Sequence, residues 1–264
     1  MRIKPRHADD RVFLLPNLFT SGNLFFGFFA LISSINGFYK RACFAILLAT
    51  VFDMLDGRIA RFTKSFSKFG EEFDSLTDLI SFGLAPAVLI FFWSGLNSAP
   101  SPLNRFGWLA SFFFIACGAL RLARYNTQPK EQDFVGLPIP VAAGTLVSGA
   151  LFYMEFDQNW HLEYISLAVT IGLGFLMVSR IPYKGYKDLE IRQRRPFPIL
   201  VLLVLLVSLM IIRPEGILFT LSATYVLFGG IWGALTKKRI EKKKSASSLI
   251  PIIRPLEKAR SESQ

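Results

Sequence analysis

Four aspartates stand close together in a part of the chain that is otherwise largely apolar. They are Asp53, Asp56, Asp74 and Asp78, in the stretch DMLDGRIARFTKSFSKFGEEFDSLTD. Side chains three or four residues apart lie on one face of a helix, so the first two acids pair and the last two pair. The polar link between them, roughly residues 62–70, is short and makes the two helices antiparallel neighbours. We therefore expect all four carboxylates to converge at one end of the helix pair.

Converging carboxylates repel one another, and the repulsion is strong in a confined space. Protonation, basic partners or divalent cations can relieve it. Carboxylate oxygens suit hard cations such as Mg²⁺ or Mn²⁺, which also bind phosphate oxygens. Two such ions about 4 Å apart can hold a diphosphate and stabilise an in-line displacement at phosphorus. The pattern predicts a two-metal site that acts on a phosphate ester.

Small and basic residues between the acids fit the same interpretation. Gly57 and Gly70 allow a ligand or a neighbouring helix to approach the backbone, and Ala60 keeps the face shallow. Arg58 and Arg61 place positive charge where phosphate oxygens need it. Taken singly, such an arginine is most often a membrane-surface anchor and a single aspartate near a helix end a capping group. Their combination at fixed spacing favours a binding site.

The composition places these acids in a membrane protein. Of the 264 residues, 52% are hydrophobic, 27 are Phe and only 19% are charged, and the mean hydropathy is +0.41. Soluble domains carry about 25% charged residues. The net charge of +11 would suggest nucleic acid for a soluble chain, but basic loops at a membrane surface explain it better, and we expect no nucleic-acid partner. An ionised group inside a span is costly, which strengthens the case for a functional acid cluster.

The sequence predicts an all-α fold, a polytopic bundle of about eight transmembrane helices, because lipid-exposed backbone must satisfy its own hydrogen bonds. The apolar segments lie at about 12–34, 40–60, 74–95, 105–122, 138–155, 162–180, 197–212 and 216–235. With both termini assigned to the cytoplasm, 26 of the 30 basic residues fall on the cytoplasmic side, as the positive-inside rule requires. The prediction is a multi-pass protein of the cell (inner) membrane, with the acid cluster toward the cytoplasm.

The chain ends outside the expected bundle. We predict one transmembrane domain over residues 1–235 and a basic, mobile cytoplasmic tail over 236–264, lying near anionic lipid; a stop-transfer anchor without further function is the alternative. The basic N-terminus leads into a retained first span and not a cleaved signal peptide. Cys43 and Cys117 both lie in apolar segments, which argues against a disulfide framework or a cysteine metal site.

The acid cluster carries a family resemblance. The pattern Asp53-x2-Asp56-Gly57-x2-Ala60-Arg61-x8-Gly70-x3-Asp74-x3-Asp78 matches the signature of the CDP-alcohol phosphotransferase family of integral membrane enzymes at every fixed position. The resemblance implies that Asp53, Asp56 and Asp74 are ligands of a dinuclear Mg²⁺ or Mn²⁺ centre. It further implies that Asp78 is the general base and also touches one metal, and that Gly57 packs against the nucleotide of a CDP-lipid.

The first expected span carries a second family element, Pro-Asn-x-x-Thr, matched here by Pro16, Asn17 and Thr20. In the family this element contributes to the nucleotide site, so the resemblance implies that Asn17 and Thr20 contact the cytidine diphosphate. The alternative is a helix that starts at a proline and whose polar residues satisfy local backbone groups.

Two later stretches bear on the acceptor alcohol. CGALRLARYN, with Arg121, Arg124 and Asn126, and GLPIPVAAG, residues 136–144, resemble the membrane-embedded phosphatidylserine synthases of this family. The arginines can clamp a carboxylate by charge-assisted hydrogen bonds. They can equally hold the phosphate of glycerol 3-phosphate or inositol phosphate, or serve as anchors at the membrane surface.

The resemblance implies that CDP-diacylglycerol and L-serine react to give phosphatidylserine and CMP by direct attack of the serine hydroxyl, without a covalent enzyme intermediate. A sister enzyme with another acceptor is the nearest alternative. A divalent-cation transporter is a remote one, since it predicts acids spread along the membrane depth. Family members are commonly homodimers, so a homodimer surrounded by membrane lipid is a further expectation.

Overall fold

The computed structural model describes residues 10–63, 67–127, 136–155, 161–181 and 215–230. Within these ranges the chain forms helices and no strand. In chain order they are α1 (Asp10–Ile35), α2 (Tyr39–Thr63), α3 (Lys68–Asp78), a π-helical segment η1 (Leu79–Leu84), α4 (Ala85–Trp93), α5 (Leu103–Thr127), α6 (Ile139–Glu155) and α7 (Leu162–Val178). A further apolar helix covers Glu215–Gly230.

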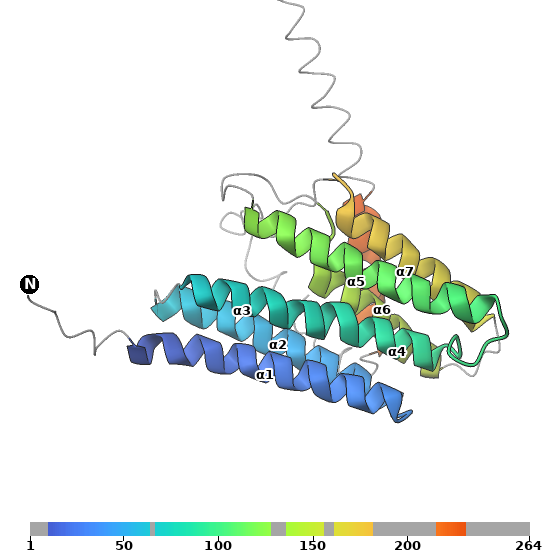
Figure 1. The fold of residues 1–264 in the computed structure, drawn as a ribbon, viewed down its shortest axis with the longest axis horizontal. Helices are drawn as coiled ribbons and strands as arrows, with labels where there is room; N and C mark the ends of the chain where they lie inside the picture. The colour runs from blue at the N-terminus through green and yellow to red at the C-terminus, as the bar shows by residue number, and fades with distance from the viewer. Residues whose placement is uncertain (1–9, 64–66, 128–135, 156–160, 182–214, 231–264) are drawn as a thin grey trace, which may run out of the picture.

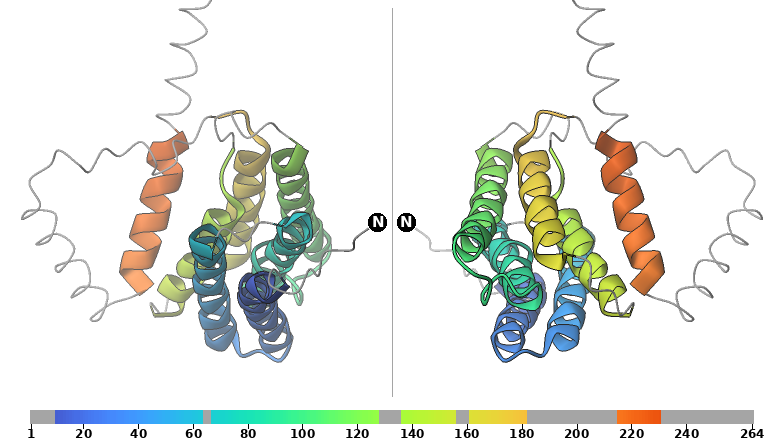
Figure 2. Two further views of the ribbon diagram at one scale, coloured as in Figure 1. Left: turned by 90° about the vertical axis from the view of Figure 1, so that its left-hand side faces the viewer. Right: turned by 90° about the vertical axis from the view of Figure 1, so that its right-hand side faces the viewer.

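The helices pack as a bundle around the α3–η1–α4 rod (Figure 1). α1 lies against α2 and also contacts α3, η1 and α4, while α5 packs on α4 and η1 and pairs with α7. α6 lies behind, between α2 and α7, and the helix Glu215–Gly230 lies beside it at the edge of the bundle (Figure 2). The start of α1, the end of α2, the start of α3 and the end of α5 all lie at one end (Figure 1).

Three helical stretches are long and apolar enough to cross a membrane, namely Pro16–Ile35, Lys68–Trp93 and Leu103–Thr127. Three more apolar helices are shorter: Ile139–Glu155, Leu162–Val178 and Glu215–Gly230. These six and α2 correspond to seven of the eight expected segments. The expected segment 197–212 and the basic tail 236–264 lie outside the described residues. The all-helical, membrane-type fold is therefore found, while the number of eight spans stays a prediction.

The side-chain distribution is that of a protein embedded in lipid. Large apolar residues point outward, as Phe25 and Phe28 of α1 do with 61% and 58% of their surface exposed. Small residues fill the helix contacts instead, including Ala42, Ala45 and Ala49 of α2, all buried. Small residues allow the close helix approach on which packing within a bilayer depends. Apolar area facing outward costs nothing where the solvent is a lipid chain.

α3, η1 and α4 form one continuous helical rod, which has a π-helical segment, η1, in its middle. Pro86 has no N–H and its ring would collide with the carbonyl four residues earlier, so a regular α-helix cannot pass this point. The backbone instead bonds one residue further back, with the N–H of Ala85 donating to the carbonyl oxygen of Ile80. Such π-helical turns frequently occur at functional sites. Here η1 begins directly after Asp78, the last residue of α3.

Candidate active site

The acid cluster is built by the facing ends of α2 and α3. Ser67 starts α3 as an N-cap, its Oγ accepting a 2.9 Å hydrogen bond from the backbone N–H of Gly70. α3 runs antiparallel to α2 (Figure 1), and carboxylate oxygens of Asp53, Asp56 and Asp74 lie within 4.8 Å of one another. The structure thus brings together acids from both helices, as their spacing predicts. Asp56 is buried and the other two are half-buried.

Asp78 is one turn deeper on α3 and has 9% of its surface exposed. It lies close enough to Asp53, Asp74 and Asp56 for their charges to act on it, but it is outside the group of three carboxylates that share one centre. Its Oδ1 accepts a hydrogen bond of 3.3 Å from Nδ2 of Asn23 on α1. The fourth acid is therefore adjacent to the cluster and held from a different helix.

The group of three carboxylates fits a divalent cation. Oxygen ligands about 2.1 Å from one Mg²⁺ lie up to about 4 Å apart, so a spread of 4.8 Å needs only small side-chain adjustment. Oδ1 of Asp74 is buried and has no hydrogen-bond partner among the described residues. A buried carboxylate oxygen without a partner is costly, and a cation would remove that cost. Donor type, spacing and this unpartnered oxygen together suit Mg²⁺ or Mn²⁺.

α1 supplies a third wall to the cluster. Oγ1 of Thr20 lies 3.0 Å from Oδ2 of Asp56 and 3.1 Å from the carbonyl oxygen of Pro16, and it can donate to either. Thr20 is expected from sequence to meet the nucleotide, and the structure places it on a carboxylate of the cluster. Asn17 lies one turn earlier, beside Gly70, where an added Cβ would be 3.4 Å from its Oδ1.

The small and basic residues of the motif line the same end. A Cβ at Gly57 would meet nothing closer than 4.0 Å, so the surface above it is open to a ligand. Arg61 is folded back along its own helix, its Nε donating to the carbonyl oxygen of Gly57 at 2.8 Å. Both Arg58 and Arg61 are exposed, while Ala60 is half-buried. None of these contacts joins Arg58 or Arg61 to a carboxylate of the cluster.

The three residues expected to bind the acceptor have different surroundings. Arg124 donates from Nη1 to the carbonyl oxygen of Val178 at 3.2 Å, which fixes the end of α7. Asn126 joins α5 to α3, donating from Nδ2 to Oγ of Ser75 at 3.1 Å. Arg121 differs, because its buried Nε has no hydrogen-bond partner among the described residues. Its guanidinium is near enough to Asp78 for an electrostatic interaction between the two charges. Of the three, Arg121 is the residue whose charge interacts with one of the four aspartates, Asp78.

The Gly136–Gly144 stretch has a structural function at its start. Gly136 has a φ of +88°, and its N–H donates to the carbonyl oxygen of Ile181 at 2.9 Å. An added Cβ would collide with the backbone at Met177 and lie 3.2 Å from the oxygen of Ser179. Glycine is required here by conformation and by space. The segment therefore ties the start of α6 to the end of α7.

Sequence reasoning missed two polar residues that hold the site together. Asn23 contacts Asp78, and Oγ of Ser81 donates to the backbone oxygen of Asn23 at 3.1 Å. A signal for Asn23 exists, since it follows Thr20 by three residues and shares its helix face. Ser81 offers no comparable signal, because its position depends on the widened turn after α3.

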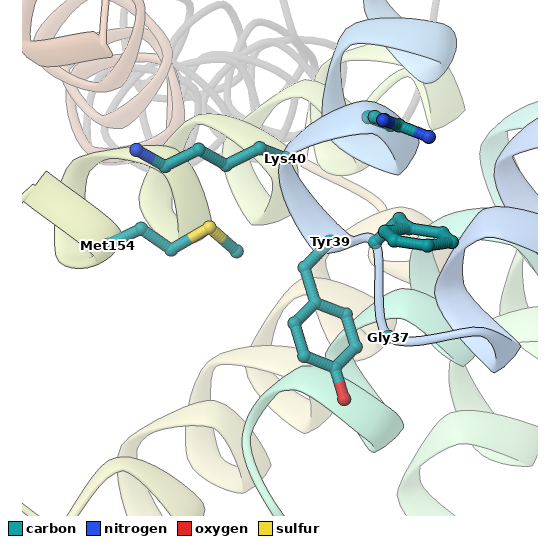
Figure 3. Close-up of a pocket in the computed structure, with 6 residues that line it drawn as sticks. Gly37, Tyr39, Lys40 and Met154 are labelled. Atoms are coloured by element: carbon teal, nitrogen blue, oxygen red, sulfur yellow. The ribbon is translucent and has the colours of Figure 1, made fainter.

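A hollow of about 290 Å³ opens at the α1–α2 turn (Figure 3). It is lined by Gly37, Phe38, Tyr39, Lys40, Arg41 and Met154. This turn joins the ends of α1 and α2 that lie away from the acid cluster (Figure 1). Lys40 extends toward Met154, and Tyr39 points away from them (Figure 3), its hydroxyl donating to the carbonyl oxygen of Phe92 at 3.3 Å. The hollow is thus separate from the acids.

Comparison with known proteins settles the family. The model of the CDP-alcohol phosphatidyltransferase family matches residues 13–176, a region that contains all four aspartates. The chain belongs to this family. Relatives within it include the CDP-diacylglycerol–serine O-phosphatidyltransferase of Helicobacter pylori, 36% identical over 245 residues, which are 89% of this chain and 98% of the relative.

Two further relatives align over shorter parts of the chain. The archaetidylserine synthase of Methanothermobacter thermautotrophicus is 38% identical over 64% of this chain and 69% of its own length. The CDP-diacylglycerol–serine O-phosphatidyltransferase of Mycobacterium tuberculosis H37Rv is 30% identical over 81% of this chain and 76% of its own length. All three relatives carry names that refer to serine.

Proposed function

We propose that this chain transfers the phosphatidyl group of CDP-diacylglycerol to L-serine, giving phosphatidylserine and CMP. The observation that carries the proposal is the convergence of Asp53, Asp56 and Asp74 within 4.8 Å, with Asp78 next to them. The choice of serine is supported by the relative from Helicobacter pylori, whose name states that acceptor and which aligns over 98% of its length.

Each acid has an assigned part in the proposed reaction. Asp53, Asp56 and Asp74 would hold two Mg²⁺ or Mn²⁺ ions, with Asp78 at the edge of the same centre. When bound, such ions neutralise the diphosphate and the departing CMP. Asp78 accepts the proton of the serine hydroxyl, whose oxygen forms the new bond to the lipid-side phosphorus. The bond from that phosphorus to the oxygen of CMP breaks, and no covalent enzyme intermediate is formed.

The nucleotide is assigned to the open surface at the facing ends of α1, α2 and α3. Gly57 and Ala60 leave room for it, Asn17 and Gly70 border it from the other side, and the exposed side chains of Arg58 and Arg61 can turn toward its phosphates. Thr20 would contribute through Asp56, to which it can donate a hydrogen bond.

The serine carboxylate is assigned to Arg121. This half-buried residue lies near enough to Asp78 for their charges to interact, and its Nε has no hydrogen-bond partner among the described residues. Arg124 and Asn126 would support the acceptor site indirectly, because their side chains already hold α7 and α3. A guanidinium also binds phosphate, so acceptors with a phosphate group are the alternative that experiment has to exclude.

An acceptor panel tests this proposal. The purified full-length protein is supplied with CDP-diacylglycerol, Mn²⁺ and, separately, L-serine, glycerol 3-phosphate or inositol phosphate. We expect equimolar CMP and phosphatidylserine with L-serine alone, and no reaction after chelation of the metal. Turnover with a phosphorylated acceptor but not with serine would assign the chain to a sister activity. Mn²⁺ flux into sealed vesicles without CMP release would favour a transporter.

The placement in the membrane is also proposed. The acid end of the bundle would face the cytoplasm of the inner membrane, since 26 of the 30 basic residues then lie on that side. CDP-diacylglycerol would enter from the lipid while L-serine arrives from water. Reporter fusions after residues 155 and 235 should show opposite sides of the membrane, and cross-linking in native membrane should reveal the expected homodimer.

A further inference from the structure

Asn23 is a buried amide in the middle of an apolar helix. It lies on α1 within the sequence GNLFFGFF and has 0% of its surface exposed. Burying an amide without hydrogen bonds is costly. Its one side-chain hydrogen bond among the described residues is the 3.3 Å bond that Nδ2 donates to Oδ1 of Asp78, because its own Oδ1 has no partner there. The position of this amide is therefore tied to Asp78.

The backbone at Asn23 is fixed to the segment that follows Asp78. Oγ of Ser81, in η1, donates to the backbone oxygen of Asn23 at 3.1 Å. One turn further along α1, an added Cβ at Gly27 would collide with the side chain of Ser81 and lie only 2.9 Å from its Cα. Glycine thus lets α1 touch η1 directly. The amide of Asn23 and the carboxylate of Asp78 are therefore carried by two helical segments, α1 and α3–η1, whose backbones are in direct contact.

This contact controls which way the Asp78 carboxylate points. Charges of three other aspartates act on Asp78, and cations held by them would attract it. The amide of Asn23 keeps one carboxylate oxygen, Oδ1, on the α1 side, although the carboxylate also lies within hydrogen-bonding distance of Asp53. Without the amide, the carboxylate can turn further into the cluster of three acids, away from an acceptor hydroxyl.

We propose that Asn23 is a positioning residue that keeps Asp78 oriented for proton transfer. The inference rests on the proposed function of Asp78 as the base, but the contact itself can be tested separately. Asn23 acts through Asp78 and does not touch the substrate. A misplacement of about 1 Å can cost about 100-fold in rate, which sets the scale of the expected effect.

The main test replaces Asn23 by Leu, which keeps the branching at Cγ and removes the donor. We expect kcat for CMP release to fall at least tenfold, with the KM values for CDP-diacylglycerol and the acceptor within about twofold of wild type. The affinity and stoichiometry of Mn²⁺ binding, measured by calorimetry without substrate, should stay unchanged. The stoichiometry also reports which fraction of the variant protein is correctly folded. Ser34→Ala is the control, since Ser34 is also fully buried on α1, but among the described residues its hydroxyl bonds only to Ala30 of its own helix.

A second measurement tests the contact without using activity. Thermal unfolding is followed for wild type, Asn23→Leu, Asp78→Ala and the double variant. Asn23→Leu should lower the unfolding temperature of the wild-type protein, because it removes a hydrogen bond to the Asp78 carboxylate. In the Asp78→Ala background that hydrogen bond is already absent, so the same substitution should not lower the unfolding temperature. Equal shifts in both backgrounds would overturn the proposal.

Other outcomes are equally decisive. Unchanged kcat in Asn23→Leu refutes positioning, and a parallel loss of Mn²⁺ affinity would show that Asn23 supports the metal ligands instead of Asp78. If wild type releases CMP with an acceptor other than serine, the proposed acceptor fails and the Asn23 test is run with that acceptor. If wild type releases no CMP at all, the proposed function fails while the unfolding cycle still decides the contact.

Discussion

Replacing Thr20 by Val gives the sharpest test of how α1 supports the proposed metal ligands. Val has nearly the same shape as Thr but no hydroxyl, so a site with 3% exposure keeps its packing. The substitution removes the 3.0 Å hydrogen bond to Oδ2 of Asp56. The substitution also removes the contact of the hydroxyl with the carbonyl oxygen of Pro16. That oxygen lies within α1, where a backbone N–H can still donate to it.

The magnitude follows from the type of bond that is lost. A hydrogen bond to a charged group contributes about 1.5–3 kcal/mol, and 1.4 kcal/mol corresponds to a factor of about ten. If the bond orients Asp56 for metal binding, Thr20→Val should weaken Mn²⁺ binding about 10- to 100-fold. The same range is typical for loss of a group that hydrogen-bonds a metal ligand.

Calorimetric titration of the purified protein with Mn²⁺, without nucleotide, measures this directly. Thr50→Val on α2 is the matched control, because within the described part of the chain Oγ1 of Thr50 donates only to the carbonyl oxygen of Ile46 in its own helix. The KM for CDP-diacylglycerol is measured in parallel. Unchanged Mn²⁺ affinity in Thr20→Val, together with a raised KM, would refute this reasoning and return Thr20 to direct nucleotide contact.

Three further outcomes follow from the site and its supports. Asp78→Asn should keep Mn²⁺ and CDP-diacylglycerol binding but lose turnover, measured as CMP release; normal turnover would remove it as the base. Asp56→Asn should instead weaken Mn²⁺ and nucleotide binding together, which calorimetry with each ligand distinguishes. Gly136→Ala should destabilise the fold by at least about 1 kcal/mol, because the residue has a positive φ and faces the backbone at Met177. Thermal unfolding measures this against Gly172→Ala, where an added Cβ meets nothing within 4 Å.

The acid cluster was predictable because its geometry is local. Spacings of three and four residues place each pair of acids on one face of a helix. Two adjacent helices joined by a short link run antiparallel. Asp53, Asp56 and Asp74 therefore meet as the sequence indicates. Hydropathy likewise located the described spans, since a bilayer requires long apolar helices whatever their partners are.

Contacts between distant segments were not predictable in the same way. Arg121, Arg124 and Asn126 are neighbours in sequence, but successive helix positions turn by about 100° and so face different helices. As a result Arg124 bonds to α7 and Asn126 to α3, while Arg121 lies near enough to Asp78 for their charges to interact. The bond from Asn23 to Asp78 joins residues 55 positions apart, and only the packed bundle shows it.

The two donors that α1 offers to the cluster are both neutral, and this matters for a site that is proposed to bind cations. A lysine or arginine in place of Thr20 or Asn23 would hold the carboxylates equally well but would cancel their charge. A hydroxyl and an amide orient Asp56 and Asp78 and leave the negative charge available to a metal ion. The exposed positions of Arg58 and Arg61 follow the same logic. There the positive charge can meet phosphate at the surface of the site without occupying the place of the ions.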